Sequence, residues 1–247
     1  MKRFRGNIIR SSHLTFLCLL ITAFAVANQT TLAVLDFENH SFFNKETYQP
    51  LAKGLAEMLI TELDQLQSVR MVERRDLARI IDEIKLAQSG LSDEGSMQIG
   101  KMSGAQNLVF GGFMVSPGDK IRIDMRVVEV ETGLTQKAAE VTGNTKDILK
   151  LIKQLSNKIV KDLDITLTKD ESRLLSQSPK IKVEAVMIFS EGLMLEDQDQ
   201  LKEAYLKYKK ALELEPEFMQ ARESINRLKR IVSERQKQSQ TTGTKSD

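Results

Sequence analysis

Hydrophobic and polar positions alternate along the chain with two periods, one typical of strands and one of helices. Leu32, Ala33, Val34 and Leu35 are apolar on both faces of a strand, which indicates a central position in a sheet. Leucines at helical spacing follow, and Pro50 stands where a first helical turn accepts it. The first part of the chain therefore predicts a strand over 30–39, a helix over 50–67, a strand over 69–73, a helix over 74–90 and a short helix over 93–102.

The middle of the chain has the clearest strand pattern. Ile121, Ile123, Met125 and Val127 alternate with polar residues, which predicts a strand with one buried face. A buried strand comes before it, another strand follows the turn Glu131–Gly133, and a helix is expected over 146–165. We therefore predict an α+β class fold over residues 28–167, an α/β sandwich in which helices cover a mixed sheet.

Residues 1–27 have the pattern of a secretory signal peptide. Basic residues precede an unbroken apolar run, which ends in Ala25-Val26-Ala27, the small-x-small pattern that signal peptidase recognises. A permanent membrane anchor is the alternative, although the run is shorter than the ~20 apolar residues of a spanning helix. Lipidation of Cys18 is a further alternative, which the large residues Phe16 and Leu17 disfavour. We expect an exported protein that begins near Asn28.

Cleavage would change the composition of the chain. Four of the 36 basic residues lie in the signal, which leaves 32 against 34 acidic residues in the mature protein. This balance makes nucleic acid an unexpected partner. Cys18 is the only cysteine, so the mature chain has no thiol for a disulfide, a zinc site or a nucleophile. We expect neither a metal nor a cofactor.

Residues with catalytic potential are few. Asp36 and Glu38 form an acid pair on one face at the end of the first strand, and a hydrolase that uses this pair is the alternative function that we consider. His40 is the only histidine of the mature chain, and its loop position predicts a surface residue. A basic cluster at the start of the 74–90 helix and in the strand before it is interleaved with acids, which predicts a solvated face with ion pairs. It comprises Arg70, Arg74, Arg75 and Arg79.

The segments "LAVLDFEN", "VERRDLARIIDEIKLAQSGL" and "GAQNLVFGGF" occur in this order. Together they resemble the CsgG family of envelope assembly and secretion components, over about Thr31 to Thr142, and the same domain is similar to the amino-terminal domain of TolB. The resemblance implies a bacterial envelope protein without enzymatic activity. It further implies a role in protein export or assembly at the outer membrane, in curli-, flagellar- or polysaccharide-type machinery.

The family's namesake forms a pore, and the turns of this chain bear on that activity. The membrane hairpins of such a pore need ~9–11 residues per strand beyond the soluble sheet, and the turns Ser116–Asp119 and Glu131–Gly133 leave no room for them. We therefore expect a periplasmic adaptor or assembly factor, at most peripheral to the outer membrane, that binds envelope proteins or a second copy of itself. An accessory or activator protein of cell-wall synthesis is the alternative within the same class.

The segment "AYLKYKKALELEP" opens a second region of the chain. We expect a linker over 168–182, helices over 183–237 and a disordered polar tail over 238–247. Five residues stand at the spacing of the tetratricopeptide signature, namely Gly192, Ala204, Tyr208, Ala211 and Pro216. We therefore predict a small all-α hairpin of tetratricopeptide type with a capping helix from Glu217. An ordinary helical hairpin that completes the fold is the alternative.

The first helix of this hairpin carries the candidate binding residues. Val186, Phe189 and Leu193 form an apolar stripe, and Glu196 lies one turn further on. A single repeat cannot bury its faces alone, so the stripe must meet the αβ domain, another copy or a partner. We predict a partner or self-association.

Overall fold

The computed structural model describes residues 29–87, 93–177 and 180–243; the predicted signal peptide therefore lies outside the described residues. The αβ part contains β1 (Thr30–Val34), β2 (Glu38–Asn39), α1 (Lys45–Tyr48), α2 (Leu51–Asp64), β3 (Val69–Met71), α3 (Arg74–Ala87), α4 (Asp93–Ser103), β4 (Asn107–Ser116), β5 (Lys120–Glu129), β6 (Thr135–Asn144), the 3-10 turn η1 (Thr145–Asp147) and α5 (Ile148–Asp162). The remainder is α6 (Lys169–Ser176), α7 (Val183–Asp197), α8 (Leu201–Leu214) and α9 (Met219–Gly243).

The predicted mixed sheet is confirmed. Its strand order is β3-β1-β4-β5-β6, and β2 extends the line of β1 along β4. β1 runs parallel to both β3 and β4, as its buried two-sided pattern requires, whereas β4, β5 and β6 form an antiparallel meander. The predicted strands and helices appear in the expected order. The strand predicted over 30–39 is interrupted and forms β1 and β2, whereas the short helix α1 is an addition that no periodic pattern indicated.

Helices cover the two faces of the sheet unequally. On one face, α2 and α5 bury the inward side of the meander, including Ile121, Ile123 and Val127. On the other face, a smaller core joins α3 and α4 to Ala33, Leu35 and other residues near β1. The outer side of the meander lies beyond this smaller core, where Arg122 and Arg126 are exposed. The fold therefore leaves part of one sheet face open.

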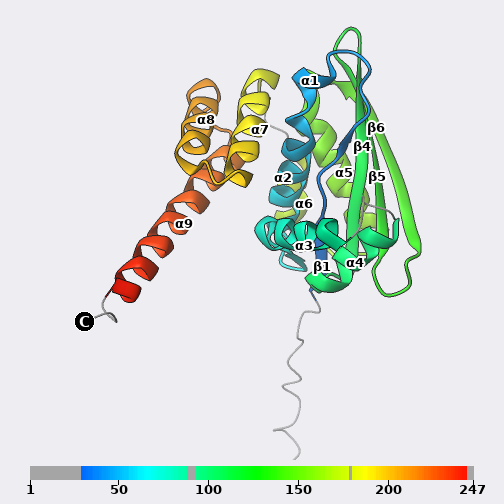
Figure 1. The fold of residues 1–247 in the computed structure, drawn as a ribbon. Helices are drawn as coiled ribbons and strands as arrows, with labels where there is room; N and C mark the ends of the chain where they lie inside the picture. The colour runs from blue at the N-terminus through cyan, green and yellow to red at the C-terminus, as the bar shows by residue number, and fades with distance from the viewer. Residues whose placement is uncertain (1–28, 88–92, 178–179, 244–247) are drawn as a thin grey trace, which may run out of the picture.

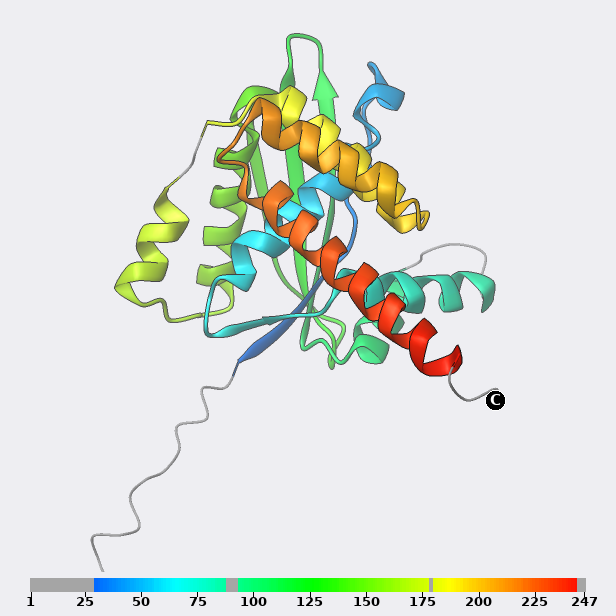
Figure 2. The same cartoon turned by 90° about the vertical axis from the view of Figure 1, so that its left-hand side faces the viewer.

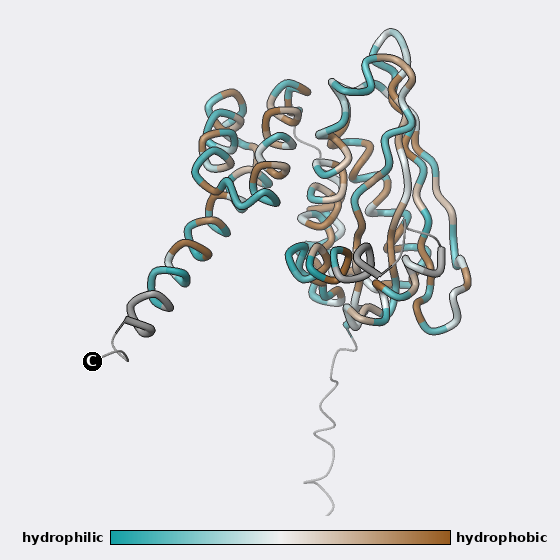
Figure 3. Tube along the Cα trace, in the orientation of Figure 1, coloured by the Kyte–Doolittle hydropathy of each residue, from teal (hydrophilic) through white to brown (hydrophobic). Residues whose placement is uncertain are grey.

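Among the C-terminal helices, α7 packs on the outside of α2, α9 touches α2 as well, and α8 lies beyond α7, as Figure 1 shows; Figure 2 gives the same helices from the side. α2 is consequently covered on two sides, by the sheet and by α7, and most of its residues are buried. Gly54 makes the close approach possible, because a Cβ atom at this position would lie 2.0 Å from Oγ of Ser190 on α7. Brown apolar stretches recur in the strands and in the helices beside them, whereas much of the outer surface of α8 is teal (Figure 3).

The structure corrects the expectation of an exposed stripe on α7. Val186, Phe189 and Leu193 are all fully buried. The ring centroid of Phe189 lies 5.6 Å from that of Tyr208 and 5.0 Å from that of Phe218, so Phe189 belongs to the core of the C-terminal helices. Val186 and Leu193 share the helical face of Ser190, which meets α2. Of the three alternatives for the stripe, the structure shows contact with the αβ domain.

The hairpin of α7 and α8 is present, and its small residues have the predicted packing role. A Cβ atom on Gly192 would lie 2.5 Å from the Tyr208 ring, so only glycine fits there. Ala204, Tyr208 and Ala211 are fully buried, and α8 ends two residues before Pro216. The assignment of this hairpin to the tetratricopeptide class stays a prediction.

Two expectations for the flanking segments need comment. The predicted linker contains the helix α6, which begins with a complete capping box between Thr168 and Glu171. The predicted disordered tail is partly wrong, because α9 continues through Gly243, although the last four residues lie outside the described part. Within 29–87, 93–177 and 180–243, no helix combines the length and the apolarity needed to cross a membrane.

The buried position of Phe189 leads to a first prediction. Replacing Phe189 by Ala should lower the free energy of unfolding by about 3–5 kcal/mol, because it removes the ring that fills the space between Tyr208 and Phe218. Urea denaturation followed by circular dichroism measures the change. Leu206→Ala is the control, since this side chain is 55% exposed on α8 and should change stability little. Equal effects of the two substitutions would contradict the observed burial.

Candidate binding groove

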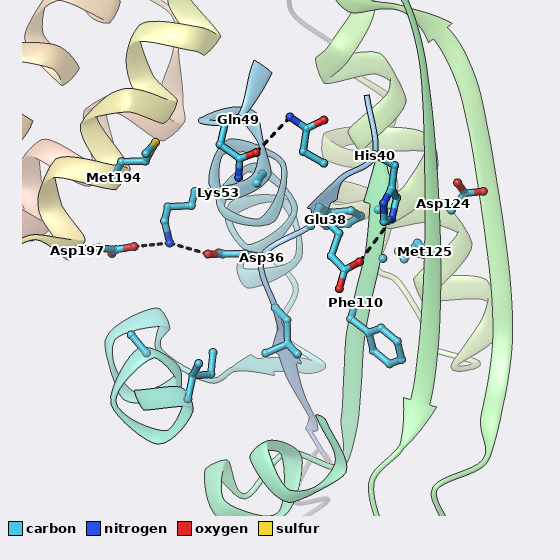
Figure 4. A pocket seen from close by; sticks show the side chains of 18 of the residues that line it. Asp36, Glu38, His40, Gln49, Lys53, Phe110, Asp124, Met125, Met194 and Asp197 are labelled. Atoms are coloured by element: carbon cyan, nitrogen blue, oxygen red, sulfur yellow. Dashed lines mark hydrogen bonds and ion pairs between the residues drawn. The ribbon is translucent and has the colours of Figure 1, made fainter. Parts of the chain in front are cut away.

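A groove of about 1400 Å³ lies where the open sheet face meets the C-terminal helices. It passes the carboxyl end of β1, and its walls come from β4–β6, α3 and the α7–α8 turn (Figure 4). In αβ sheets, the carboxyl ends of parallel strands are a frequent place for ligands, because the connections diverge there. The chain leaves β1 at this point towards α2 on one face, while α3 lies on the other.

Lys53 of α2 joins the two walls of this groove. Its Nζ lies 2.6 Å from Oδ2 of Asp36, which follows β1, and 2.6 Å from Oδ2 of Asp197 at the end of α7. Burial by itself lowers the pKa of Lys53, but the two carboxylates outweigh it and the net pKa is raised. One cation is therefore held between two acids, and it fixes the αβ domain to the C-terminal helices.

Glu38 and His40 lie on the sheet side of the groove. The Nε2 atom of His40 is 3.5 Å from Oε2 of Glu38, and the imidazole ring lies over Gly112 of β4. A Cβ atom on Gly112 would come within 2.5 Å of that ring, so the glycine makes room for the histidine. Asp36 and Glu38 thus have different partners, Lys53 and His40, and point apart in Figure 4. The predicted acid pair does not converge on one point.

The open sheet face repeats the pattern of a shared cation. Arg122 on β5 lies 2.8 Å from Asp124 and 2.9 Å from Glu140 on β6. Arg126 is exposed one pleat further along, between Phe110 of β4 and Ala138 of β6 in the register of the sheet. Within the described residues, its guanidinium has no ion pair or hydrogen bond. Arg126 therefore places a cation without an ion pair among the described residues beside the partly buried ring of Phe110.

A buried cluster of charges closes the inner end of the groove. We call Glu57, Arg74, Glu196, Asp197 and Arg227 the ion cluster. Arg227 of α9 binds Glu57 of α2 and lies 3.0 Å from Glu196 of α7. Arg74 of α3 binds Asp197 of α7 and lies 3.6 Å from Glu57. The cluster thus ties together α2, α3, α7 and α9, in addition to the bridge through Lys53.

The carboxylate of Glu196 is held charged by these neighbours. Burial by itself raises its pKa, but the Arg227 guanidinium and the hydroxyl of Tyr208, which donates a 2.6 Å hydrogen bond, lower it below its ordinary value. Glu62, deeper in the same interface, shows the opposite balance. Burial raises the pKa of Glu62 by more than the hydrogen bonds from Lys153 and Gln220 lower it, so the net pKa is raised.

The structure places the predicted site residues in two groups. Val186, Phe189 and Leu193 lie in the core, and Glu196 is 8% exposed in the ion cluster, so none of the four forms a free surface. Arg74 corrects the expected solvated face, since its side chain is 13% exposed and engaged by two acids. Arg79 does follow that expectation, with an exposed pair to Asp76. His40 lies near the surface as predicted, 57% exposed.

Sequence reasoning missed the pairing of Arg227 and Lys53 with acids that are distant in the chain. One signal was available, because α7 is apolar on more than one face and also carries Ser190 and Gly192. A helix that is apolar all round is buried on two sides, which predicts contact with the αβ domain rather than with a free partner. No local feature of the sequence indicates that α2 is the helix that covers α7.

One family model matches part of the chain. Residues 18–116 match the family model described as curli production assembly/transport component CsgG. This part of the chain is CsgG-like. The match contains β1 to β4 and thus the side of the groove formed by Asp36, Glu38 and Gly112. No curated protein matches the sequence.

Several solved structures resemble parts of the chain at low identity. The LpoB C-terminal domain from Salmonella enterica is 15% identical, with a TM-score of 0.35, over 49% of this chain and 87% of that one. The PelC dodecamer from Paraburkholderia phytofirmans is 12% identical, with a TM-score of 0.35, over 56% and 90%. TolB from Acinetobacter baumannii is 10% identical, with a TM-score of 0.38, over 57% of this chain but only 29% of TolB. Likenesses this distant say nothing about function.

The ion cluster leads to a second prediction. Arg227→Met should lower the free energy of unfolding by about 3–5 kcal/mol, because it leaves Glu57 and Glu196 buried without their shared cation. Denaturation in urea at neutral pH measures the loss. Arg230→Met is the matched control on the same helix, where the side chain is exposed, and it should have little effect. A cluster that contributes no stability would show the same small change in both variants.

A third prediction follows from the lowered pKa of Glu196. A carboxyl whose pKa is lower in the folded protein stabilises the fold above its unfolded pKa of about 4.3, and this contribution is lost as the pH falls through the folded pKa. The free energy of unfolding should therefore fall more steeply below about pH 4.3 in the native protein than in Glu196→Gln. Parallel pH profiles from 7 to 3 for both proteins would refute this if their slopes coincide.

Proposed function

We propose that this protein is a non-enzymatic periplasmic adaptor or assembly factor of the bacterial envelope, working in export or assembly at the outer membrane. The observation that carries the proposal is the CsgG-like match over residues 18–116, which covers β1, β2 and β4 at the groove but not β5 or β6. The matching family model is described as an assembly and transport component, and we assign this role to the chain as part of the proposal. The protein would act by binding partner polypeptides in the groove.

The composition of the groove supports binding. Apolar surface from Phe110 and Met194 is combined with charged groups around it, the usual arrangement of a recognition site. The charges are held in place by ion pairs within the protein, such as Lys53 with Asp36 and Arg122 with Asp124. Prearranged groups of this kind bind without a large ordering cost.

A hydrolase that uses Asp36 and Glu38 is less well supported. Two-carboxylate chemistry needs an acid and a base on either side of one reacting bond. Here each carboxylate has its own cationic or imidazole neighbour on a different side of the chain. An accessory role in cell-wall synthesis would use the same groove, and the identity of the bound partner distinguishes it from export.

The proposal is tested by site-specific photo-crosslinking in living cells. A benzophenone amino acid at Ala138, exposed on the open sheet face, should crosslink to an envelope protein, because this residue lines the groove. The same amino acid at Leu206, on the outer face of α8, is the control and should give no such product. Mass spectrometry identifies the partner and its machinery.

The charge of Arg126 provides a second arm of this test. Arg126→Glu should reduce the Ala138 crosslink severalfold without changing stability, because the side chain is exposed and unpaired within the described residues. A groove that binds no envelope partner would give no product from Ala138, or the same products from both crosslinking positions. Either result would contradict the proposal.

A further inference from the structure

The sheet ends in a long strand that is paired on one side. Among the described residues, β6 is the last strand in the order and pairs with β5, and Figure 1 shows it at the outer edge of the meander. The strand at the opposite edge, β3, has three residues, whereas β6 has ten. A long edge strand presents a row of backbone donors and acceptors to an incoming chain. The edge of β6 is therefore the better of the two places for an additional strand.

Two contacts show which backbone groups of β6 face outwards. The N–H of Thr145 donates a 2.8 Å hydrogen bond to the carbonyl of Asp119, just beyond the paired ends of β5 and β6. Bonded pairs in an antiparallel ladder recur at every second residue, so Glu140 and Ala138 have their N–H and carbonyl groups directed away from β5. In agreement, the carbonyl of Glu140 accepts a 3.2 Å hydrogen bond from Nζ of Lys158, an exposed residue of α5.

A cation lies beside this edge. Arg126 is directly opposite Ala138 in the register of β5 and β6, and it has no ion pair or hydrogen bond among the described residues. The methyl side chain of Ala138 leaves the space between Arg126 and the edge open. An added strand would lie two strand spacings, about 10 Å, from β5, a span that an arginine and a carboxylate side chain cover together. The edge therefore matches a strand with an acidic residue next to Ala138.

A second copy of this chain fits the edge less well than a segment without a covering helix. The helix α5 packs on β6, so closely that a Cβ atom on Gly143 would lie 2.9 Å from the Leu151 side chain. Two copies joined through β6 would bring their α5 helices over adjacent strands about 4.8 Å apart, whereas packed helices need about 8–10 Å. An extended segment has no such conflict.

We propose that the edge of β6 binds an extended polypeptide segment as an additional strand, with an aspartate or glutamate of that segment paired to Arg126 across Ala138. This inference rests on the proposed function, because it describes how a partner polypeptide occupies the sheet side of the groove. Backbone hydrogen bonds to Ala138 and Glu140 supply affinity, and the carboxylate supplies selectivity. An N–H of the segment replaces Lys158 at the Glu140 carbonyl.

Fluorescence anisotropy with the purified protein and dye-labelled, end-capped peptides of seven residues tests the proposal. The acidic probe alternates threonine and valine and has glutamate in place of the central valine; the neutral probe has glutamine there. The acidic probe should bind about tenfold more tightly, because only its carboxylate forms a charge-assisted hydrogen bond with Arg126. Failure of the acidic probe to bind, or equal binding of the two probes, would overturn the proposal.

Methylation of backbone nitrogens in the acidic probe tests the strand pairing itself. One version is methylated on its threonines, and the other on its valines and glutamate. Since only one edge of an added strand faces β6, one version should lose binding and the other should keep it. Loss with the valine and glutamate version indicates an antiparallel strand, and loss with the threonine version a parallel one. Equal affinities of the two versions contradict strand addition.

A charge reversal locates the selective residue. With Arg126→Glu, a probe with a central lysine should bind more tightly than the acidic probe, the reverse of the native order. Arg70→Glu makes the same change of net charge at an exposed position of β3, the opposite edge, and should keep the native order. Reversal in both variants would show that the probes respond only to the net charge of the protein.

The binding mode and the proposed function fail in different ways. A crosslink from Ala138 in cells, combined with no binding of the acidic probe, would retain an envelope partner but reject its addition as a strand. Binding of the probe without any crosslink would retain the edge site and reject the adaptor role. Self-association of the purified protein that the acidic probe disrupts would assign the edge to a second copy and overturn the proposal.

Discussion

The contact of Glu57 with Arg227 and Arg74 is the interaction on which the arrangement of this molecule depends. Glu57 is 4% exposed in the middle of α2, a position where an unpaired carboxylate would be strongly unfavourable. Its two partners come from α9 and α3, which lie on different parts of the fold. The carboxylate of Glu57 therefore has both of its cationic partners only when the C-terminal helices are docked on α2 with Arg227 in place. The close contact of Gly54 with Ser190 makes that docking specific in shape as well as in charge.

This docking also creates the groove. Without α7 and the α7–α8 turn, the carboxyl end of β1 would be an open edge with Asp36 and Lys53 in solvent. With them, Asp197 and Met194 form an outer wall opposite the sheet. The C-terminal helices thus act on function through the αβ domain rather than as a separate binding module. The buried stripe of Val186 and Leu193 stabilises this wall, which is why it is apolar.

The αβ core could be predicted from the sequence because each of its signals is local. The strict alternation around Ile123 indicates a strand with one covered face, and the two-sided apolar run around Val34 indicates a strand covered on both faces. By contrast, Arg227 and Glu57 are far apart in the chain, and nothing near either residue indicates the other. The site could be predicted only where it depends on β1, with Asp36 and Glu38, and not where it depends on long-range ion pairs.

The two pockets at the ends of β1 differ in how far their acids are neutralised, and this difference determines what each can select. In the groove, Lys53 and Arg122 are each shared by two carboxylates, so the remaining potential is modest and apolar contacts with Phe110 contribute to binding. At the opposite end of β1, near Thr30, a smaller pocket is lined by the carboxylates of Glu129, Glu131, Asp162 and Asp164, and no lysine, arginine or histidine lines it. Long-range attraction of cations would therefore act mainly at this smaller pocket, and shape matching mainly at the groove. Since β1 separates the two, a single extended partner could contact both ends of the sheet only by passing around the αβ domain.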